Sequence, residues 1–234
     1  MDFFILRNVQ ERRTGSISGF FRKIFRKILK MDIVPLPYSE EMFTIEQQIN
    51  FHHLINYVIK IKVEGEFVEL GSFTGSTAIQ FQKFIQETKS LKKLYLFDNF
   101  SRKYGMDCDI EKQLVVNFEI NQLNLPEIVR GVFETTLPDS LPNKIAFAHI
   151  DCGYGGDIEM HKRVLLHCLD AVYSRMSKNG ICIMMDYYDS EKTIQGLDSN
   201  PGVKLACDEF FKNKPEHMIV LYGGYYSHAY FEKK

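Results

Sequence analysis

A turn with two glycines follows a short apolar run in the first third of the chain. It reads Glu69-Leu70-Gly71-Ser72-Phe73-Thr74-Gly75, and a helical pattern opens directly after it. Its glycines let the backbone turn sharply and approach a ligand closely, which is typical of nucleotide sites at helix amino termini. The same spacing also occurs wherever a helix packs tightly on a strand. If the turn binds a ligand, its contacts are expected from Glu69, Gly71, Ser72, Thr74, Gly75 and Ser76.

Asp98 ends the next apolar run, at residues 93–98, and should lie at the same sheet edge as the glycine turn. Ligands of open α/β sheets bind at that edge, where a carboxylate can accept both ribose hydroxyls. NAD would use the same geometry, and a strand-end Asp can also simply cap a loop. Two details favour S-adenosylmethionine over NAD. Glu69 precedes the glycines, where it can reach the cationic end of the cofactor, and the G-x-G-x-x-G phosphate fingerprint is absent.

The elements that must position these residues alternate between strands and helices. Expected strands are residues 66–70, 93–98, 127–130, 145–151 and 180–186, and expected helices include 74–87 and 158–176. Such alternation predicts βαβ units and a parallel sheet. Residues 218–222 and 225–231 predict a hairpin around Gly223-Gly224, because glycines supply the positive φ angles of a tight turn.

These elements predict an α/β fold of the Rossmann-like class I methyltransferase type. Its sheet is mostly parallel and seven-stranded and ends in an antiparallel hairpin, with helices on both faces, whereas a dinucleotide-binding Rossmann sheet normally stays parallel throughout. Residues 61–234 are expected to form this domain, and residues 1–60 an N-terminal helical extension. Within the extension, apolar and basic pairs alternate over residues 20–30, and a second helix is expected at about residues 44–60.

The basic amphipathic helix at residues 20–30 has two interpretations. It can lie on an anionic membrane as a peripheral contact, or it can pack on its own domain or on a second subunit, which favours a homo-oligomer. The formal net charge of −1 gives no global attraction to phosphate backbones, so no nucleic-acid partner is expected.

The five cysteines are odd in number and contain no C-x-x-C pair, which argues against a disulfide framework and a structural zinc site. No apolar run reaches the roughly 20 residues that span a bilayer. A cytoplasmic, soluble protein is the expectation.

Several ordered motifs together resemble one family. They include Gly65-Glu66-Phe67-Val68-Glu69-Leu70-Gly71, Leu96-Phe97-Asp98-Asn99-Phe100, Ile145-Ala146-Phe147-Ala148-His149-Ile150-Asp151, Met185-Asp186-Tyr187, and the segments 129–138, 177–180, 201–204 and 208–210. Each motif is short, but the ordered set is specific. The chain resembles the macrocin O-methyltransferase family of S-adenosylmethionine-dependent, magnesium-dependent enzymes.

The resemblance implies methylation of a hydroxyl on a small-molecule acceptor, typically a sugar unit of a glycosylated natural product. By resemblance, Asp151 is general base, magnesium ligand and cofactor contact, and Asp186 is a second magnesium ligand. The cofactor motifs add Asn99, Gly131 and Phe133. A carboxylate alone is too weak a base for a free alcohol, whereas a hard cation held by carboxylates lowers the pKa of a coordinated hydroxyl.

The chain departs from the family pattern at two positions. The family usually has two adjacent aspartates at the second strand end, and the first of them is here Met185. It also often has an acid two positions after the first Asp, where this chain has Gly153. Asp157 or Asp189 could replace the missing carboxylate, or the site could work without magnesium.

Other hypotheses stay open beside an O-methyltransferase. A nicotinamide-dependent reductase would share the glycine turn and Asp98, and a non-catalytic binding module could keep the methyltransferase fold. Asp151 and Asp186 can also be ordinary strand-end acids. His149 lies inside an apolar strand, where a histidine is more often a hydrogen-bonded core residue than a catalyst.

Overall fold

The computed structural model describes residues 27–28, 44–103, 107–153 and 156–234. The fold and the site lie in the compact unit of residues 41–234. The basic helix expected at residues 20–30 falls outside the described residues, except for its positions 27 and 28. Among the described helices, none combines the length and the apolar character that crossing a membrane requires.

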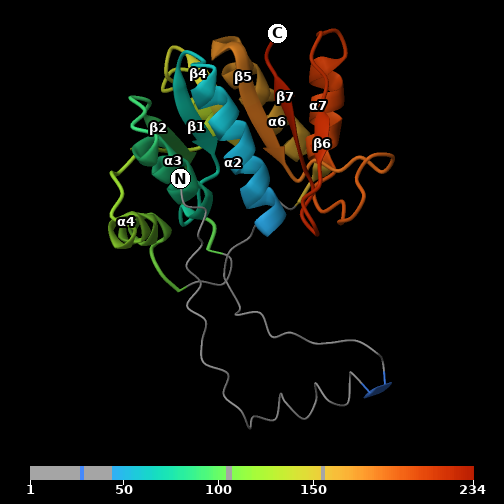
Figure 1. Cartoon of the computed structure of the whole chain (residues 1–234). Coiled ribbons are helices and arrows are strands. Elements are labelled where there is room, and N and C mark those ends of the chain that lie inside the picture. The colour runs from blue at the N-terminus through green and yellow to red at the C-terminus, as the bar shows by residue number, and fades with distance from the viewer. Residues whose placement is uncertain (1–26, 29–43, 104–106, 154–155) are drawn as a thin grey trace. The chain divides into compact units, whose positions relative to one another are not determined.

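Seven strands form one sheet in the described part of the chain, in the order β3-β2-β1-β4-β5-β7-β6 (Figure 1). They are β1 (Glu66–Leu70), β2 (Leu94–Asp98), β3 (Glu127–Arg130), β4 (Ile145–Ile150), β5 (Met176–Met185), β6 (Ile219–Leu221) and β7 (His228–Glu232). Strands β1 to β5 run parallel, and β7 lies antiparallel between β5 and β6. The predicted class I methyltransferase fold is therefore confirmed.

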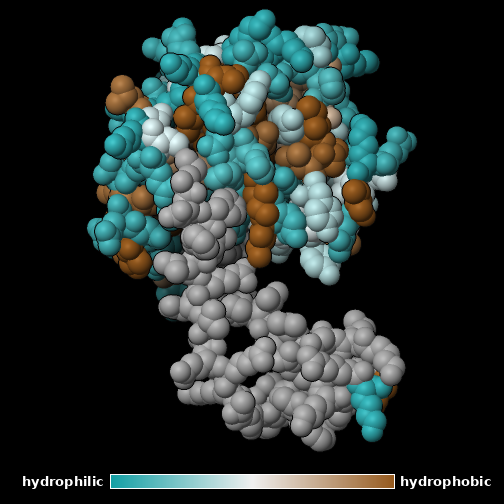
Figure 2. Space-filling model, in the orientation of Figure 1, coloured by the Kyte–Doolittle hydropathy of each residue, from teal (hydrophilic) through white to brown (hydrophobic). Residues whose placement is uncertain are grey.

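Helices cover both faces of the sheet. One face carries α2 (Ile45–Lys60), α3 (Ser76–Glu87) and α4 (Ile110–Ile120), and the other carries α5 (Phe133–Thr136), α6 (Ile158–Arg175) and α7 (Gly202–Phe211). Figure 1 shows α2 in front of the sheet and α6 behind it. Because successive strand residues point to opposite faces, Phe67 and Phe147 enter one core layer while Val68 and Ala148 enter the other. The outer surface in Figure 2 is largely hydrophilic, with apolar side chains in separate patches.

Helix α2 begins with a capping box and buries one side against the sheet. The Thr44 hydroxyl accepts from the Gln47 backbone, and the Gln47 side chain accepts from the Thr44 backbone. Phe51, Ile55 and Val58 are fully buried in the core. The sequence places this helix in an N-terminal extension; in the structure it packs within the unit of residues 41–234.

Two details of the strands differ from the sequence-based expectation. Strand β5 begins at Met176, directly after α6, and not at the expected residue 180. The additional residues are accommodated by an irregularity in the pairing of β5 with β4. The hairpin turn is longer than Gly223-Gly224, because Leu221 pairs with His228 and residues 222–227 connect the strands. A two-residue type I′ turn needs positive φ at both positions, whereas of these two glycines only Gly224 has it.

Candidate functional site

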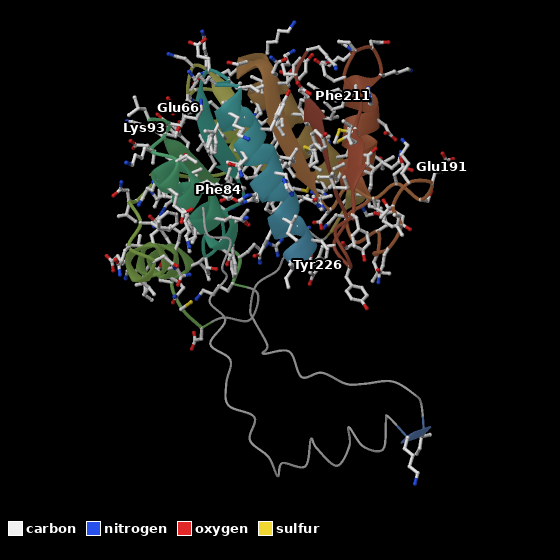
Figure 3. All side chains as sticks on the ribbon, in the orientation of Figure 1. Glu66, Phe84, Lys93, Glu191, Phe211 and Tyr226 are labelled. Atoms are coloured by element: carbon white, nitrogen blue, oxygen red, sulfur yellow. The ribbon has the colours of Figure 1, made fainter. Side chains whose placement is uncertain are left out.

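The predicted site residues gather at the edge of the sheet where the parallel strands end. Tyr226 lies near this carboxyl edge in Figure 3, and Glu66 and Lys93 lie near the opposite edge. Crevices outside the carboxyl ends of parallel strands are where open α/β sheets bind ligands. The topology therefore brings residues from β1, β2, β3, β4 and β5 to one place.

Both glycines of the turn are required by its geometry. Gly71 has φ +88°, and a β-carbon there would lie 1.9 Å from the backbone oxygen of Asp151. Gly75 has φ +85°, and a β-carbon there would lie 3.0 Å from Leu114 Cγ. Gly75 is also the N-cap of α3, and no side chain caps that helix. The turn thus passes directly against the end of β4 and leaves a helix amino terminus facing the site.

Asp98 connects the end of β2 to the glycine turn. Its Oδ2 accepts hydrogen bonds from the backbone amides of Ser72 at 2.8 Å and Phe73 at 2.9 Å, and its Oδ1 accepts one from Phe100 at 2.7 Å. A carboxylate offers about four acceptor positions, so these bonds do not exhaust it. Asp98 braces the turn, and its contact with a ribose stays a prediction.

Glu69 and His149 form a buried polar pair on neighbouring strands. Glu69 Oε1 lies 2.9 Å from His149 Nδ1, and the exposed fractions of the two residues are 1% and 0%. Phe51 and Phe81 pack edge-on against the imidazole. Burial raises the pKa of the Glu69 carboxyl, and the hydrogen bond from His149 opposes the shift. His149 is thus a core residue, as expected, and it also holds the acid at the start of the glycine turn.

Several buried polar atoms near this pair have no complete hydrogen bond to any of the residues that the structure describes. They are Glu69 Oε2, His149 Nε2 and the hydroxyl of Ser72. Unsatisfied buried polar atoms are costly, and they concentrate where a ligand or water completes their bonds. Two of these atoms belong to the first residues of the glycine turn, and the third lies beside them on β4. The sequence predicts the cofactor at this turn.

The Asp151 carboxylate lies half-buried just after β4. Its pKa is raised to about 7, above all by burial. The charges of Asp186 and Glu69 raise it as well, whereas His149 and the backbone amide of Gly153 oppose the shift. Such a carboxylate can hold or release a proton near neutral pH, as a general base must.

Asp186, Asn200 and Asp151 converge on one small space. Asn200 Nδ2 donates to Asp186 Oδ2 at 2.6 Å. A β-carbon built on Gly153 would lie 3.4 Å from Asp186 Oδ2, 3.7 Å from Asp151 Oδ1 and 3.8 Å from Asn200 Nδ2. The pKa of Asp186 is raised by burial and lowered by the bond from Asn200. The structure therefore brings the two predicted carboxylates together and adds Asn200, to which no sequence motif pointed.

The remaining predicted cofactor residues lie along the same edge. The Gly131 amide donates to the Asp98 backbone at 3.1 Å, Phe133 opens α5, and Asn99 is exposed after β2. Thr74 is buried in the turn, where its carbonyl accepts from Asn117 Nδ2 at 2.9 Å. Their contacts with a cofactor stay predictions.

Comparison with known families assigns the chain. Residues 25–200 match the macrocin-O-methyltransferase (TylF) family. The chain belongs to the macrocin O-methyltransferase family. No curated protein matches the chain significantly.

Solved structures share the fold of this macrocin O-methyltransferase family member at low sequence identity. The O-methyltransferase NovP is 19% identical with a TM-score of 0.68, over 84% of this chain and 83% of its own. The calicheamicin methyltransferase CalS11 is 14% identical with a TM-score of 0.61, over 99% of both chains. The methyltransferase PaMTH1 of Podospora anserina, solved with SAH, is 12% identical with a TM-score of 0.58, over 94% and 97%.

Met185, and the two aspartates that could replace its missing carboxylate, each contact other parts of the structure. Met185 is buried among the residues beneath α2, where its sulfur lies 3.9 Å from Gln47 Nε2. Asp157 caps α6 by accepting from the Met160 amide at 2.7 Å. Asp189 accepts from the Glu191 amide at 3.1 Å and pairs with a lysine in its own loop. Each of these carboxylates thus has a local structural role.

The described residues contain no group of three or more His, Cys, Asp or Glu side chains that could hold a metal. Asp151 and Asp186 are the two acids that meet at the site, with the Asn200 amide beside them. This donor set still suits magnesium, which keeps several waters and often takes only one or two carboxylates from a protein.

Proposed function

We propose that the chain transfers a methyl group from S-adenosylmethionine to a hydroxyl of a sugar or glycosylated small molecule, with magnesium assisting and Asp151 as the base. The observation that carries the proposal is the Asp151 carboxylate. The backbone of Asp151 lies against the glycine turn, and its carboxylate has a pKa of about 7 and faces Asp186 across the space at Gly153.

The cofactor end is supported by unsatisfied groups at the turn. S-adenosylmethionine supplies a methyl group on a cationic sulfur and carries an amino group and a ribose. Glu69 Oε2 and the Ser72 hydroxyl would receive the amino end, since both are buried and lie close to one another. Asp98 would receive the ribose with its remaining acceptor capacity. The fold neighbour PaMTH1, solved with SAH, is in keeping with this arrangement.

The proton of the acceptor hydroxyl would go to Asp151. Burial disfavours its ionised form, so the carboxylate regains stability when it takes a proton. Asp186 would hold the magnesium together with Asp151, and the cation would lower the pKa of the acceptor hydroxyl. An alcohol made more acidic in this way would need only a carboxylate to take its proton, and the cation would offset the repulsion between the two carboxylates.

An acceptor with an apolar part suits the rim of this site. Ile194, Leu197 and Tyr225 are 85%, 77% and 73% exposed. A β-carbon on Gly196 would lie 3.1 Å from the Tyr225 carbonyl, so the two segments touch. The loop that holds Ile194 and Leu197 leads to Asn200 at the carboxylates. A glycosylated small molecule could place its sugar at Asp151 and its apolar group on this rim.

Calorimetry with SAH and with NAD tests the cofactor. We expect binding of SAH and none of NAD, and the reverse result would support a nicotinamide-dependent reductase. Transfer of a labelled methyl group to a panel of sugars and glycosides then tests the acceptor. Asp151→Asn should lose transfer but keep SAH binding, and undiminished transfer by this variant would contradict the role of Asp151.

The assembly and surroundings of the protein remain part of the proposal. A homo-oligomer and a peripheral membrane contact through residues 20–30 rest on the sequence of a segment outside the described residues. Light scattering and vesicle sedimentation of the full chain, compared with a chain that begins at residue 41, would test both.

A further inference from the structure

Asn200 lies at the end of the loop that leads from β5 to α7. Its side chain points back to the end of β5, where Nδ2 donates to Asp186 Oδ2 at 2.6 Å. Hydrogen bonds to an ionised acceptor are shorter and stronger than neutral ones, and this bond is short. The bond spans 14 positions of sequence and closes the whole loop onto the site.

The backbone around Asn200 holds this amide in place. The Asn200 carbonyl accepts from the Val203 amide at 3.0 Å, and Pro201 restricts the conformation of the residue before it. Next along the chain, a β-carbon on Gly202 would lie 2.9 Å from His161 Nδ1, so α7 starts in close contact with α6. A side chain fixed by such surroundings loses little entropy when it orients a neighbour.

Asp186 requires such a donor. It has φ +58°, in the left-handed region that is uncommon for residues other than glycine. Burial raises the pKa of its carboxyl, and the bond from Asn200 is the largest opposing influence. Without that bond, the carboxylate would be less stable in its ionised form and free to turn away from Asp151.

A neutral amide suits this position better than a third acid. The charge of Asp186 already raises the pKa of Asp151, and another carboxylate would add repulsion in the absence of a cation. Met185 and Gly153 stand where the family has further acids, and Asp157 and Asp189 have other partners. Asn200 can orient one carboxylate and adds no charge.

We propose that Asn200 is a positioning residue, which holds the Asp186 carboxylate toward Asp151 so that the two acids can share a divalent cation. The proposal rests on the metal-assisted function proposed above. It assigns to a neutral side chain the orientation of one of the two acids that remain.

A double-mutant cycle tests this role with Mn²⁺ as the probe, measured by electron paramagnetic resonance on the full chain with SAH bound. The cycle compares wild type, Asn200→Ala, Asp186→Asn and the double variant. Ser199→Ala is the matched control, because Ser199 is its exposed neighbour in the same loop. Calorimetry with SAH on each protein reports whether the fold and the cofactor end are intact.

We expect Asn200→Ala to weaken Mn²⁺ binding roughly tenfold to a hundredfold, the effect typical of residues that orient a metal ligand. The double variant should bind no more weakly than Asp186→Asn, because Asn200 acts only through Asp186. If Asn200 had a merely structural role, Asn200→Ala would instead weaken Mn²⁺ binding by the same factor in wild type and in Asp186→Asn. Ser199→Ala should bind Mn²⁺ as wild type does.

Three results would overturn the proposal. They are a wild-type protein that binds no Mn²⁺, an Asn200→Ala variant that binds it unchanged, and losses that add in the double variant. In each case, retained SAH binding would leave the methyltransferase function standing. Failure of the wild type to bind SAH would contradict that function itself.

Discussion

Glu69 and His149 join the glycine turn to the strand that precedes Asp151 through a buried hydrogen bond of 2.9 Å. The two residues face each other in register on β1 and β4, and each continues into a part of the site. Glu69 leads into the glycine turn, and His149 stands two residues before Asp151. A change in this pair should therefore affect stability and cofactor binding in different ways.

Glu69→Gln should stabilise the fold and weaken the binding of the cofactor. Because burial raises the pKa of Glu69 in the folded protein, its ionised form costs free energy at pH 8. Glutamine keeps an oxygen for His149 and removes that cost, so the free energy of unfolding in urea should rise by about 1 kcal/mol at pH 8. The gain should shrink at lower pH, where the native carboxyl takes up its proton. Calorimetry should show weaker SAH binding by this variant. If the variant is instead less stable than wild type at pH 8, the ionised Glu69–His149 pair stabilises the fold.

Gly71→Ala should be strongly destabilising. A β-carbon there would lie 1.9 Å from the Asp151 carbonyl, and φ +88° is strained for alanine. The turn or the end of β4 must move, at an expected cost of about 3 kcal/mol or more in urea unfolding. Gly153→Ala is the matched control, since its β-carbon would meet only ordinary contacts of 3.4 Å and longer. Equal stability of the two variants would show that the turn is not tightly packed.

The sequence predicts the sheet and the turn well because both have local signals. Gly71 and Gly75 sit between an apolar strand and an apolar helix, and the order of strands and helices along the chain predicts the parallel sheet. The hairpin is predicted correctly, but its turn is not. Register with β5 decides where β7 starts, and register is a property of the whole sheet.

The site is predicted less completely because its last members meet only in three dimensions. Asp151 and Asp186 end strands and belong to recognisable motifs. Asn200 comes from a loop with no periodic pattern, and its role follows only from the bond to Asp186. The hydrogen-bond partners of Asp157 and Asp189 also cannot be predicted from the sequence unless the ends of the helices and loops are known. Asp157 directly precedes the helical pattern at residues 158–176, and Asp is a preferred N-cap residue, so that signal could have identified one of them.

The pKa of Asp151 predicts opposite effects of pH on stability and on transfer. Its value of about 7 in the folded protein lies above the ordinary 3.8, so the folded state binds a proton between these values that the unfolded state has released. Stability should then fall as pH rises from about 4 to 7, by an amount on the order of 1 kcal/mol after solvent screening. Methyl transfer should also rise with pH as the base ionises, but at lower pH than the loss of stability, because a bound cation favours the ionised carboxylate.

Asp151→Asn separates the two effects. This variant should lose transfer, and its urea-unfolding free energy should fall less between pH 5 and pH 8 than that of wild type, in a buffer that contains a chelator. An unchanged pH dependence of stability would show that Asp151 titrates at its ordinary value in the folded protein.

Gly153→Asp should strengthen metal binding by restoring an acid where the family often has one. The new β-carbon would lie 3.4 Å from Asp186 Oδ2 and 3.7 Å from Asp151 Oδ1, so the added carboxylate enters the space that the two acids share. Affinity for hard cations grows with the number of charged oxygens, and we expect Mn²⁺ to bind roughly tenfold more tightly. Gly153→Asn has nearly the same shape without the charge and should give little gain. If Asp and Asn at this position bind Mn²⁺ equally well, or neither binds it better than wild type, the cation does not lie between Asp151 and Asp186.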